Sequence, residues 1–144
     1  MPQFRDPLPE GARTFESRLQ VQWADVDIAG IMYFGAYWRF AEYAEQRMFE
    51  SIGYPYEQVH DRFDFWMPRV HVEATYHSSA LMGDWIRMRA HVDRVGASSI
   101  SYTVVMFNER TAEANAVLKL TIAAMSRKTK KSMPLPDPIR AALT

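Results

Sequence analysis

The sequence contains no cysteine. This absence excludes disulfides, thiolate catalysis and cysteine-ligated metals, so any chemistry must use oxygen and nitrogen groups. No apolar run approaches the roughly 20 residues that a membrane-spanning helix needs. Segment 1–10 combines three prolines with three charged residues, which is unlike a secretory signal, and we therefore expect a cytoplasmic protein.

An excess of either charge is also absent. Lys and Arg number 17 and Asp and Glu number 17. The chain therefore has no global field to attract nucleic acid or an anionic membrane, and we expect neither as a partner. Hydrophobic residues make up 48% of the 144 residues, which is enough for one core but little for two. We predict a single domain over 1–144.

Two common catalytic signatures are missing as well. The sequence has no Gly-x-Ser-x-Gly elbow for a serine triad. Its four histidines are not spaced as a helical metal pair. They are His60, His71, His77 and His91. His71, Glu73 and His77 fall on one face of a predicted strand, which we interpret as a solvated sheet face. We therefore expect no metal.

The periodicity of apolar residues predicts a strand and then a long helix. A strand is predicted over 14–23, where every second residue is apolar in much of the segment. Its apolar residues are Phe15, Leu19, Val21 and Trp23. Apolar residues then recur at helical spacing from Tyr37 to Ile52, and Gly53 is placed to end a helix of about four turns.

Beyond this helix and an irregular connection over 54–65, strand periodicity returns. The predicted strands cover 68–76, 86–92, 100–107 and 114–125, and turn-forming residues separate them at 82–84, 94–99 and 108–113. The third of these strands is apolar on both faces, like a central strand. One helix and an antiparallel sheet bury their apolar faces most simply when the sheet wraps around the helix. We therefore predict an α+β hotdog fold.

The segment between the first strand and the helix carries more than the fold requires. It contains an Asp-x-Asp-x-x-Gly run at Asp25, Asp27 and Gly30, followed by Tyr33 and then Tyr37 at the start of the helix. This pattern resembles the 4-hydroxybenzoyl-CoA thioesterase family of hotdog enzymes. The resemblance extends more loosely over most of the chain, through the strand of residues 68–76, the Gly-Asp pair at 83–84 and the segment 135–137.

The resemblance implies an acyl-CoA thioesterase in which Asp27 is catalytic and the backbone amide of Phe34 is the oxyanion donor. A helix N-terminus suits the negative charge that develops on a thioester oxygen under attack. Asp27 then acts either as a nucleophile or as a general base towards water. Many relatives have His at or after position 34, so only the main-chain role of Phe34 is carried over.

Two other roles for Asp27 are compatible with its sequence context. Asp27 and Gly30 occupy the first and fourth positions of a common turn, which is a purely structural role. A calcium loop would instead need an oxygen ligand at its fifth position and Glu at its twelfth, and Ala29 and Ala36 stand there. The calcium reading therefore fails, and we favour catalysis by Asp27 over the turn alone. Asp25 is expected to bond loop amides.

The rest of the predicted site binds substrate. Aromatic residues, Tyr33 and Tyr37 among them, either line an acyl pocket or form core at a subunit contact. Arg94 and Lys131 lie where the resembled family places cationic contacts to the phosphates of coenzyme A, although each also fits an exposed turn. Coenzyme A is then part of the substrate, and no separate cofactor is expected.

The sequence supports one main interpretation of the function and leaves two alternatives. The main reading is hydrolysis of an aryl or a short to medium acyl-CoA by a homodimer or homotetramer whose sheet is extended across protomers. The first alternative, a hotdog dehydratase, needs a histidine beside the helix, and the sequence has no histidine before His60. A binding protein for acyl-CoA without catalysis is the second rival, and the presence of Asp27 argues against it.

Overall fold

The computed structural model describes residues 3–144, and its elements follow the predicted order with short additions. The strands are β1 (Phe15–Gln20), β2 (Phe65–Trp66), β3 (Arg69–Tyr76), β4 (Trp85–Val95), β5 (Ser99–Asn108), β6 (Glu113–Ala123) and β7 (Met125–Ser126). The helices are η1 (Trp23–Asp25, a 3-10 turn), α1 (Ala36–Ser51), α2 (Tyr56–Phe63) and α3 (Asp137–Leu143).

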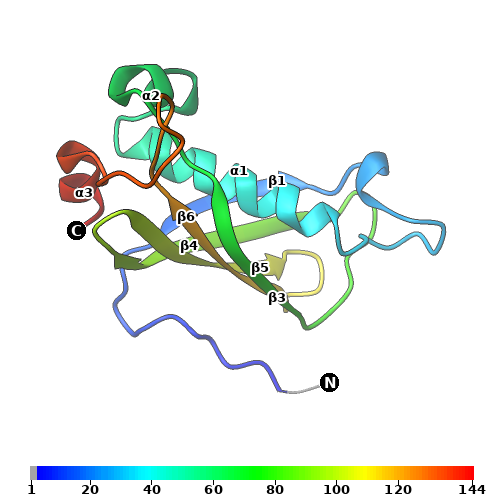
Figure 1. The fold of residues 1–144 in the computed structure, drawn as a ribbon. Helices are drawn as coiled ribbons and strands as arrows, with labels where there is room; N and C mark the ends of the chain where they lie inside the picture. Colours follow the sequence, from blue (N-terminus) through cyan, green and yellow to red (C-terminus); the bar gives the residue numbers. More distant parts are fainter. Residues whose placement is uncertain (1–2) are drawn as a thin grey trace.

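Five strands form one antiparallel sheet in the order β1-β4-β5-β6-β3. β5 is central, as its apolar pattern predicted, and β4, β5 and β6 form the expected meander. β3 leaves this succession, because it pairs with β6 and becomes an edge strand. β2 and β7 pair separately. The sheet wraps around one long helix (Figure 1), which confirms the hotdog prediction.

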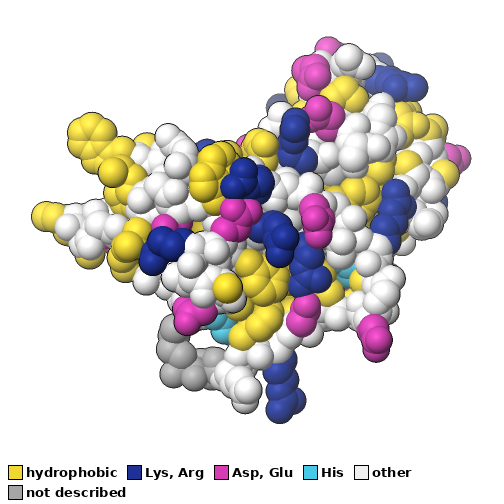
Figure 2. Space-filling model, turned by 180° about the vertical axis from the view of Figure 1, so that it is seen from behind, with side chains coloured by type: hydrophobic (Ala, Val, Ile, Leu, Met, Phe, Trp, Pro, Cys, Tyr) yellow, Lys and Arg dark blue, Asp and Glu magenta, His cyan; other side chains and the backbone are white. Residues whose placement is uncertain are grey.

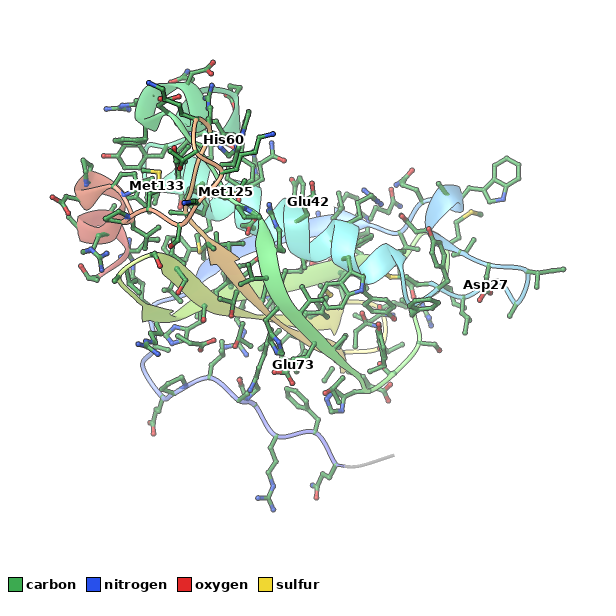
Figure 3. The ribbon with its side chains drawn as sticks, viewed as in Figure 1. Asp27, Glu42, His60, Glu73, Met125 and Met133 are labelled. Atoms are coloured by element: carbon green, nitrogen blue, oxygen red, sulfur yellow. The ribbon has the colours of Figure 1, made fainter. Side chains whose placement is uncertain are left out.

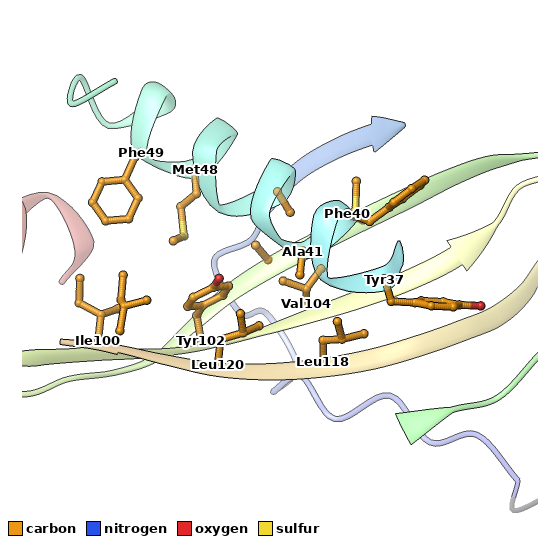
Figure 4. Packing of buried hydrophobic residues seen from close by; sticks show 14 of the residues in the cluster. Tyr37, Phe40, Ala41, Met48, Phe49, Ile100, Tyr102, Val104, Leu118 and Leu120 are labelled. Atoms are coloured by element: carbon orange, nitrogen blue, oxygen red, sulfur yellow. The ribbon is translucent and has the colours of Figure 1, made fainter. Parts of the chain in front are cut away.

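The core lies between α1 and the sheet. Fully buried side chains along one face of α1 meet the buried residues of β5 and β6 (Figure 4). On the helix they include Phe40, Ala41, Ala44, Met48 and Phe49, and on the two strands Ile100, Tyr102, Val104, Leu118 and Leu120. The helical spacing of apolar residues therefore predicted the buried face correctly. Burying a large side chain of this kind stabilises the fold by about 1.5–3 kcal/mol.

One core carboxylate accompanies these apolar residues. Glu45 of α1 has no exposed surface. Its two oxygens accept hydrogen bonds from the Tyr102 hydroxyl, at 3.0 Å, and from the Arg69 guanidinium. Arg69 also donates to the carbonyl of Met67. The ion pair ties the start of β3 to the middle of α1, because a buried carboxylate is tolerated only with such partners.

Three local predictions were wrong. Segment 54–65 contains α2 rather than an irregular connection, with Pro55 before its first turn and Val59 buried. The first strand ends at Gln20, because Val21 exchanges backbone hydrogen bonds with the turn that contains Gly83 and the chain then turns through η1. Trp23 therefore leaves the sheet and is 83% exposed.

The outer face of the sheet is partly covered by the N-terminal segment. The Phe4 ring packs edge-on against His77 and Phe107, and Asp6 pairs with Arg89. His77 is therefore half-buried rather than on a fully solvated strand face. Figure 2, a view from behind, shows charged side chains of both signs intermingled. Within residues 3–144 no helix has the length and apolar character needed to cross a membrane.

Candidate functional site

The loop before α1 is held in place by Asp25. Its buried carboxylate accepts hydrogen bonds from the Gln22 amide at 2.8 Å and from Nε of Arg39 at 3.0 Å. The Asp25 carbonyl accepts a further bond from the Tyr33 amide. One residue therefore ties together the start of the loop, its end and the first turns of α1. Asp25 bonds a loop amide as predicted, and the contact to Arg39 is additional.

Asp27 lies at the tip of this loop (Figure 3) and forms the predicted turn. Its carbonyl accepts from the Gly30 amide at 2.9 Å, and its Oδ1 accepts from the Ala29 amide at 2.9 Å. Gly30 has φ of +77°, a conformation that favours glycine. The Asp27 side chain is exposed, and its Oδ2 accepts no hydrogen bond within residues 3–144. The turn therefore engages one oxygen of the Asp27 carboxylate and leaves the other without a partner in the described part of the chain.

A pocket of about 260 Å³ opens at the N-terminus of α1. Its lining is mainly apolar and comes from the loop, the first turn of α1 and the segment after β3. The lining residues are Ile31, Met32, Phe34, Tyr37, Tyr76, Ser78 and Ser79. Such a mostly apolar cavity with a few polar groups is typical of a small-molecule site.

Phe34 directly precedes Gly35, the N-cap residue of α1, and its amide lies near this pocket. Among the residues the structure describes it donates no hydrogen bond, and neither does the amide of Gly35. Free amides at a helix N-terminus carry partial positive charge and bind an anionic oxygen. Phe34 is exposed and is one of the residues that line the pocket.

Tyr37 forms the inner wall of the pocket. Its ring packs edge-on against Tyr76 with 4.9 Å between centroids, and its hydroxyl accepts a hydrogen bond from Nδ2 of Asn115. Burial raises the pKa of Tyr37. The phenol is therefore neutral near pH 7.

The other predicted residues lie at varying distances from the pocket. The Tyr33 ring folds over Gly35 and is not part of the lining. Asp27 is also outside the lining, although its amide donates to the carbonyl of Ile31, a lining residue. Arg94 precedes the turn between β4 and β5, which bonds to α3 because Arg140 donates to the carbonyl of Ala97, and Lys131 follows β7, which pairs with β2 directly after α2. Both α2 and α3 lie at the C-terminal end of α1, away from its N-terminus (Figure 1). One protomer therefore does not bring these cations to the pocket.

The histidines form no metal site in the described chain, residues 3–144, where no group of three or more His, Asp or Glu side chains is placed to hold an ion. His71 and Glu73 are neighbours on the exposed edge of β3, with 3.5 Å between Nε2 and Oε1. His60 is turned towards the carbonyl of Phe65.

Asp84 is connected to the pocket through Leu81 and Ile31. It is buried and accepts hydrogen bonds from Nε of Arg110 at 2.6 Å, Nδ2 of Asn108 at 2.7 Å and the amide of Leu81 at 2.9 Å. Leu81 in turn bridges to the pocket residue Ile31. The hydrogen bonds from Arg110 are the largest cause that holds the pKa of Asp84 low, at about 2.

This lowered pKa makes a testable contribution to stability. The folded pKa of Asp84 lies below its ordinary value of 3.8, so the stabilisation is present above about pH 4 and is lost as the pH falls towards 2. Asp84→Asn should lower the melting temperature at pH 7. It should also reduce the change in melting temperature between pH 4 and pH 2. Circular dichroism measures the melting temperature of both proteins at each pH. The same dependence on pH in the two proteins would contradict this assignment.

Sheet, helix and pocket together define a hotdog protein with an apolar pocket beside the N-terminus of α1. A family model described as the thioesterase-like superfamily matches residues 21–143. The chain therefore belongs to the thioesterase-like superfamily and has the hotdog fold.

Similar proteins agree with this assignment. The 1,4-dihydroxy-2-naphthoyl-CoA hydrolase of Thermosynechococcus vestitus is 24% identical over 137 residues, which cover 95% of this chain and 89% of that protein. A 1,4-dihydroxy-2-naphthoyl-CoA thioesterase from Synechocystis superposes with a TM-score of 0.84 at 23% identity, over 91% of this chain and 96% of that one. A thioesterase named for the same substrate, abbreviated DHNA-CoA, from Staphylococcus aureus has a TM-score of 0.84 at 17% identity, over 90% and 87%.

Proposed function

We propose that the protein hydrolyses an acyl-CoA thioester to a carboxylic acid and free coenzyme A at the pocket beside α1. The observation that carries this proposal is the unbonded Phe34 amide, which adjoins an apolar pocket at a helix N-terminus. The thioester oxygen would accept from this amide while the acyl group enters the pocket. The similar proteins from Thermosynechococcus vestitus, Synechocystis and Staphylococcus aureus are named for hydrolysis of a CoA thioester, which supports this substrate class.

In this proposal Asp27 is the catalytic carboxylate. Its Oδ1 accepts from the Ala29 amide, and its Oδ2 has no partner among the residues that the structure describes, so one oxygen is held while the other attacks the thioester or takes a proton from water. The thiolate of coenzyme A is a good leaving group, which suits a site that has no histidine in its lining. Substrate-binding roles are proposed for Tyr33, at the loop end, and Tyr37, in the pocket wall.

The acyl group is tested by measuring kcat/KM for a panel of aryl and aliphatic CoA thioesters. The pocket of about 260 Å³ has room for an aromatic ring or a short to medium chain, so these should be hydrolysed faster than long-chain substrates. A 3-hydroxyacyl-CoA in the same panel tests the dehydratase alternative. Formation of an enoyl product without thiol release would favour that alternative.

We propose further that the protein is a homodimer or homotetramer formed through β3. This edge strand presents unpaired backbone groups and exposes Val70 and Val72 by 61% and 47%. Such an edge is suited to pairing with the same strand of a second copy.

Assembly is expected to persist at micromolar protein concentration. Light scattering should give at least the mass of a dimer. Val72→Lys, which places a charge on the proposed contact, should shift the mass towards that of a monomer. Thr111→Lys, on the exposed turn between β5 and β6, is the matched control and should leave the mass unchanged. A monomeric wild type would contradict the proposed assembly.

Arg94 and Lys131 are proposed to hold the phosphates of coenzyme A at the pocket of another protomer. Both side chains are exposed and take part in no ion pair within residues 3–144. Replacing both by Ala should raise KM several-fold with little change in kcat, because such contacts are similar in the ground and transition states. The effect should shrink at high salt. An unchanged KM would place coenzyme A elsewhere.

A further inference from the structure

The pocket beside α1 has two walls that come from distant parts of the chain. One wall belongs to the loop and to α1, and it includes Tyr37. The other wall is the end of β3 with the segment after it, and it includes Tyr76 and Ser78. The walls meet where the Tyr37 ring packs edge-on against Tyr76. The contacts that hold these walls together therefore set the width of the pocket.

Asn115, on β6, joins the two walls from outside the lining. Its side-chain Nδ2 donates to the Tyr37 hydroxyl at 3.2 Å and to the Ser78 carbonyl at 2.8 Å. Asn115 is fully buried and is not one of the lining residues. Its two hydrogen bonds therefore connect α1 to the segment after β3 without contact to a molecule in the pocket.

A β-bulge turns the Asn115 side chain towards α1. Met106 of β5 pairs with Ala116, whereas the next residue, Phe107, pairs with Ala114. Asn115 therefore has no opposite residue on β5. By simple alternation along β6 it would point away from α1, because its neighbour Ala116 faces the core. Bulges that redirect a side chain in this way are over-represented beside active sites.

The bulged asparagine also carries an unpaired acceptor. Oδ1 of Asn115 is buried and accepts no hydrogen bond from residues 3–144. A buried acceptor without a donor is destabilising. Part of the stabilisation by the two Nδ2 bonds is therefore offset, which favours a role in the pocket over a purely structural one.

The backbone of Asn115 holds the same segment independently of the side chain. Its carbonyl accepts hydrogen bonds from the amides of His77, at 2.9 Å, and Ser78, at 3.3 Å. The Ser78 hydroxyl donates to the carbonyl of Ala114 at 2.6 Å. A substitution of Asn115 should therefore leave the segment attached to β6 and remove only the side-chain link between Ser78 and Tyr37.

Resting on the proposed function, we infer that Asn115 is a positioning residue that sets the size of the acyl group the pocket admits. Its Nδ2 holds Tyr37 and Ser78 at one separation, so a short acyl group is contacted from both walls and a longer one is excluded. Asn115 acts through these two residues and touches no reacting atom. In a fixed apolar pocket, one methylene group changes kcat/KM by on the order of tenfold or more.

Asn115→Val tests this role, because valine is about as large as asparagine but donates no hydrogen bond. The quantity measured is the ratio of kcat/KM for butanoyl-CoA to kcat/KM for decanoyl-CoA. We expect this ratio to fall by about tenfold, since the walls are no longer held at one separation. The kcat for butanoyl-CoA should stay within about twofold of wild type, because the reacting groups are unchanged.

Tyr37→Phe removes the same link from the side of α1. The ring of phenylalanine retains the edge-on contact with Tyr76, so this variant should fold even if Asn115→Val does not. Its ratio should fall by a similar factor. The double variant should fall no further than either single variant, because both substitutions break one connection. A fall by the product of the two single factors would overturn the inference.

Thr103→Val is the matched control for a purely structural role. Thr103 is buried on β5 and donates to Asp93 at 2.6 Å, on the face of the sheet opposite to that of its neighbour Tyr102. This variant should lower the melting temperature and leave the ratio unchanged. An unchanged ratio in a folded Asn115→Val or Tyr37→Phe variant, whatever its melting temperature, would overturn the inference.

Binding separates a failure of this inference from a failure of the proposed function. S-butyl- and S-decyl-coenzyme A are thioethers that cannot be hydrolysed, and calorimetry gives the Kd of each. A folded Asn115→Val or Tyr37→Phe variant should lose about tenfold of the preference for the butyl compound, even if the wild type releases no thiol. An unchanged preference would overturn the inference. A changed preference without thiol release from any acyl-CoA would contradict only the proposed hydrolysis.

Discussion

Asp27→Asn is expected to lower kcat by on the order of a thousandfold while leaving the melting temperature unchanged. Asparagine keeps the shape and the turn preference of aspartate, so the bond from the Ala29 amide and the turn to Gly30 should persist. It lacks an anionic oxygen, so it can act neither as a nucleophile nor as a base. Steady-state thiol release and calorimetry measure the two quantities.

Asp25→Asn is the matched comparison for this experiment. Asp25 is buried and paired with Arg39, and it fixes both ends of the loop. Its loss should act mainly on stability, with a lower melting temperature. If instead Asp25→Asn removes activity at full stability while Asp27→Asn is active, the roles of the two aspartates must be exchanged.

The second large effect concerns the core rather than the site. Arg69→Met should lower the free energy of unfolding by about 3–5 kcal/mol, because it leaves the fully buried Glu45 carboxylate without its cation. The double variant with Glu45→Gln should recover much of this loss, since the amide is neutral and still accepts from the Tyr102 hydroxyl.

Urea unfolding of the wild type, both single variants and the double variant measures this coupling as a double-mutant cycle. Additive effects of the two substitutions would show that the ion pair does not link β3 to α1. A variant outside the pair, Arg47→Met, provides the control, because the ion pair of Arg47 with Glu50 is exposed.

The sequence predicted those features that depend on local periodicity. The spacing from Tyr37 to Ile52 indicated α1, and the doubly apolar run of 100–107 indicated the central strand. The position of β3 beside β6 was not predicted, because neither periodicity nor turn chemistry specifies which edge a strand joins. α2 was missed because its eight residues are mostly polar and bury only Val59.

Some features of the candidate site could likewise be predicted from local sequence, and others could not. The Asp-x-Asp-x-x-Gly run indicated the turn at Asp27, which the hydrogen bonds of Ala29 and Gly30 confirm. Ser78 and Ser79 had no signal of their own in the sequence, since they reach the pocket only because β3 ends beside the start of α1. Asn115, which bonds the Tyr37 hydroxyl, is brought there by β6 in the same way. The roles of Asp27 and Phe34 in catalysis stay predictions.

The central claim is that this pocket hydrolyses a CoA thioester rather than only binding it. The most direct measurement follows free thiol and carboxylic acid together after mixing the wild type with an excess of an aryl-CoA and, separately, a short aliphatic acyl-CoA. We expect equal amounts of the two products from at least one substrate, in many turnovers per site, with Asp27→Asn as the background. Saturable binding of acyl-CoA by the wild type, without thiol release from any member of a broad panel, would contradict it.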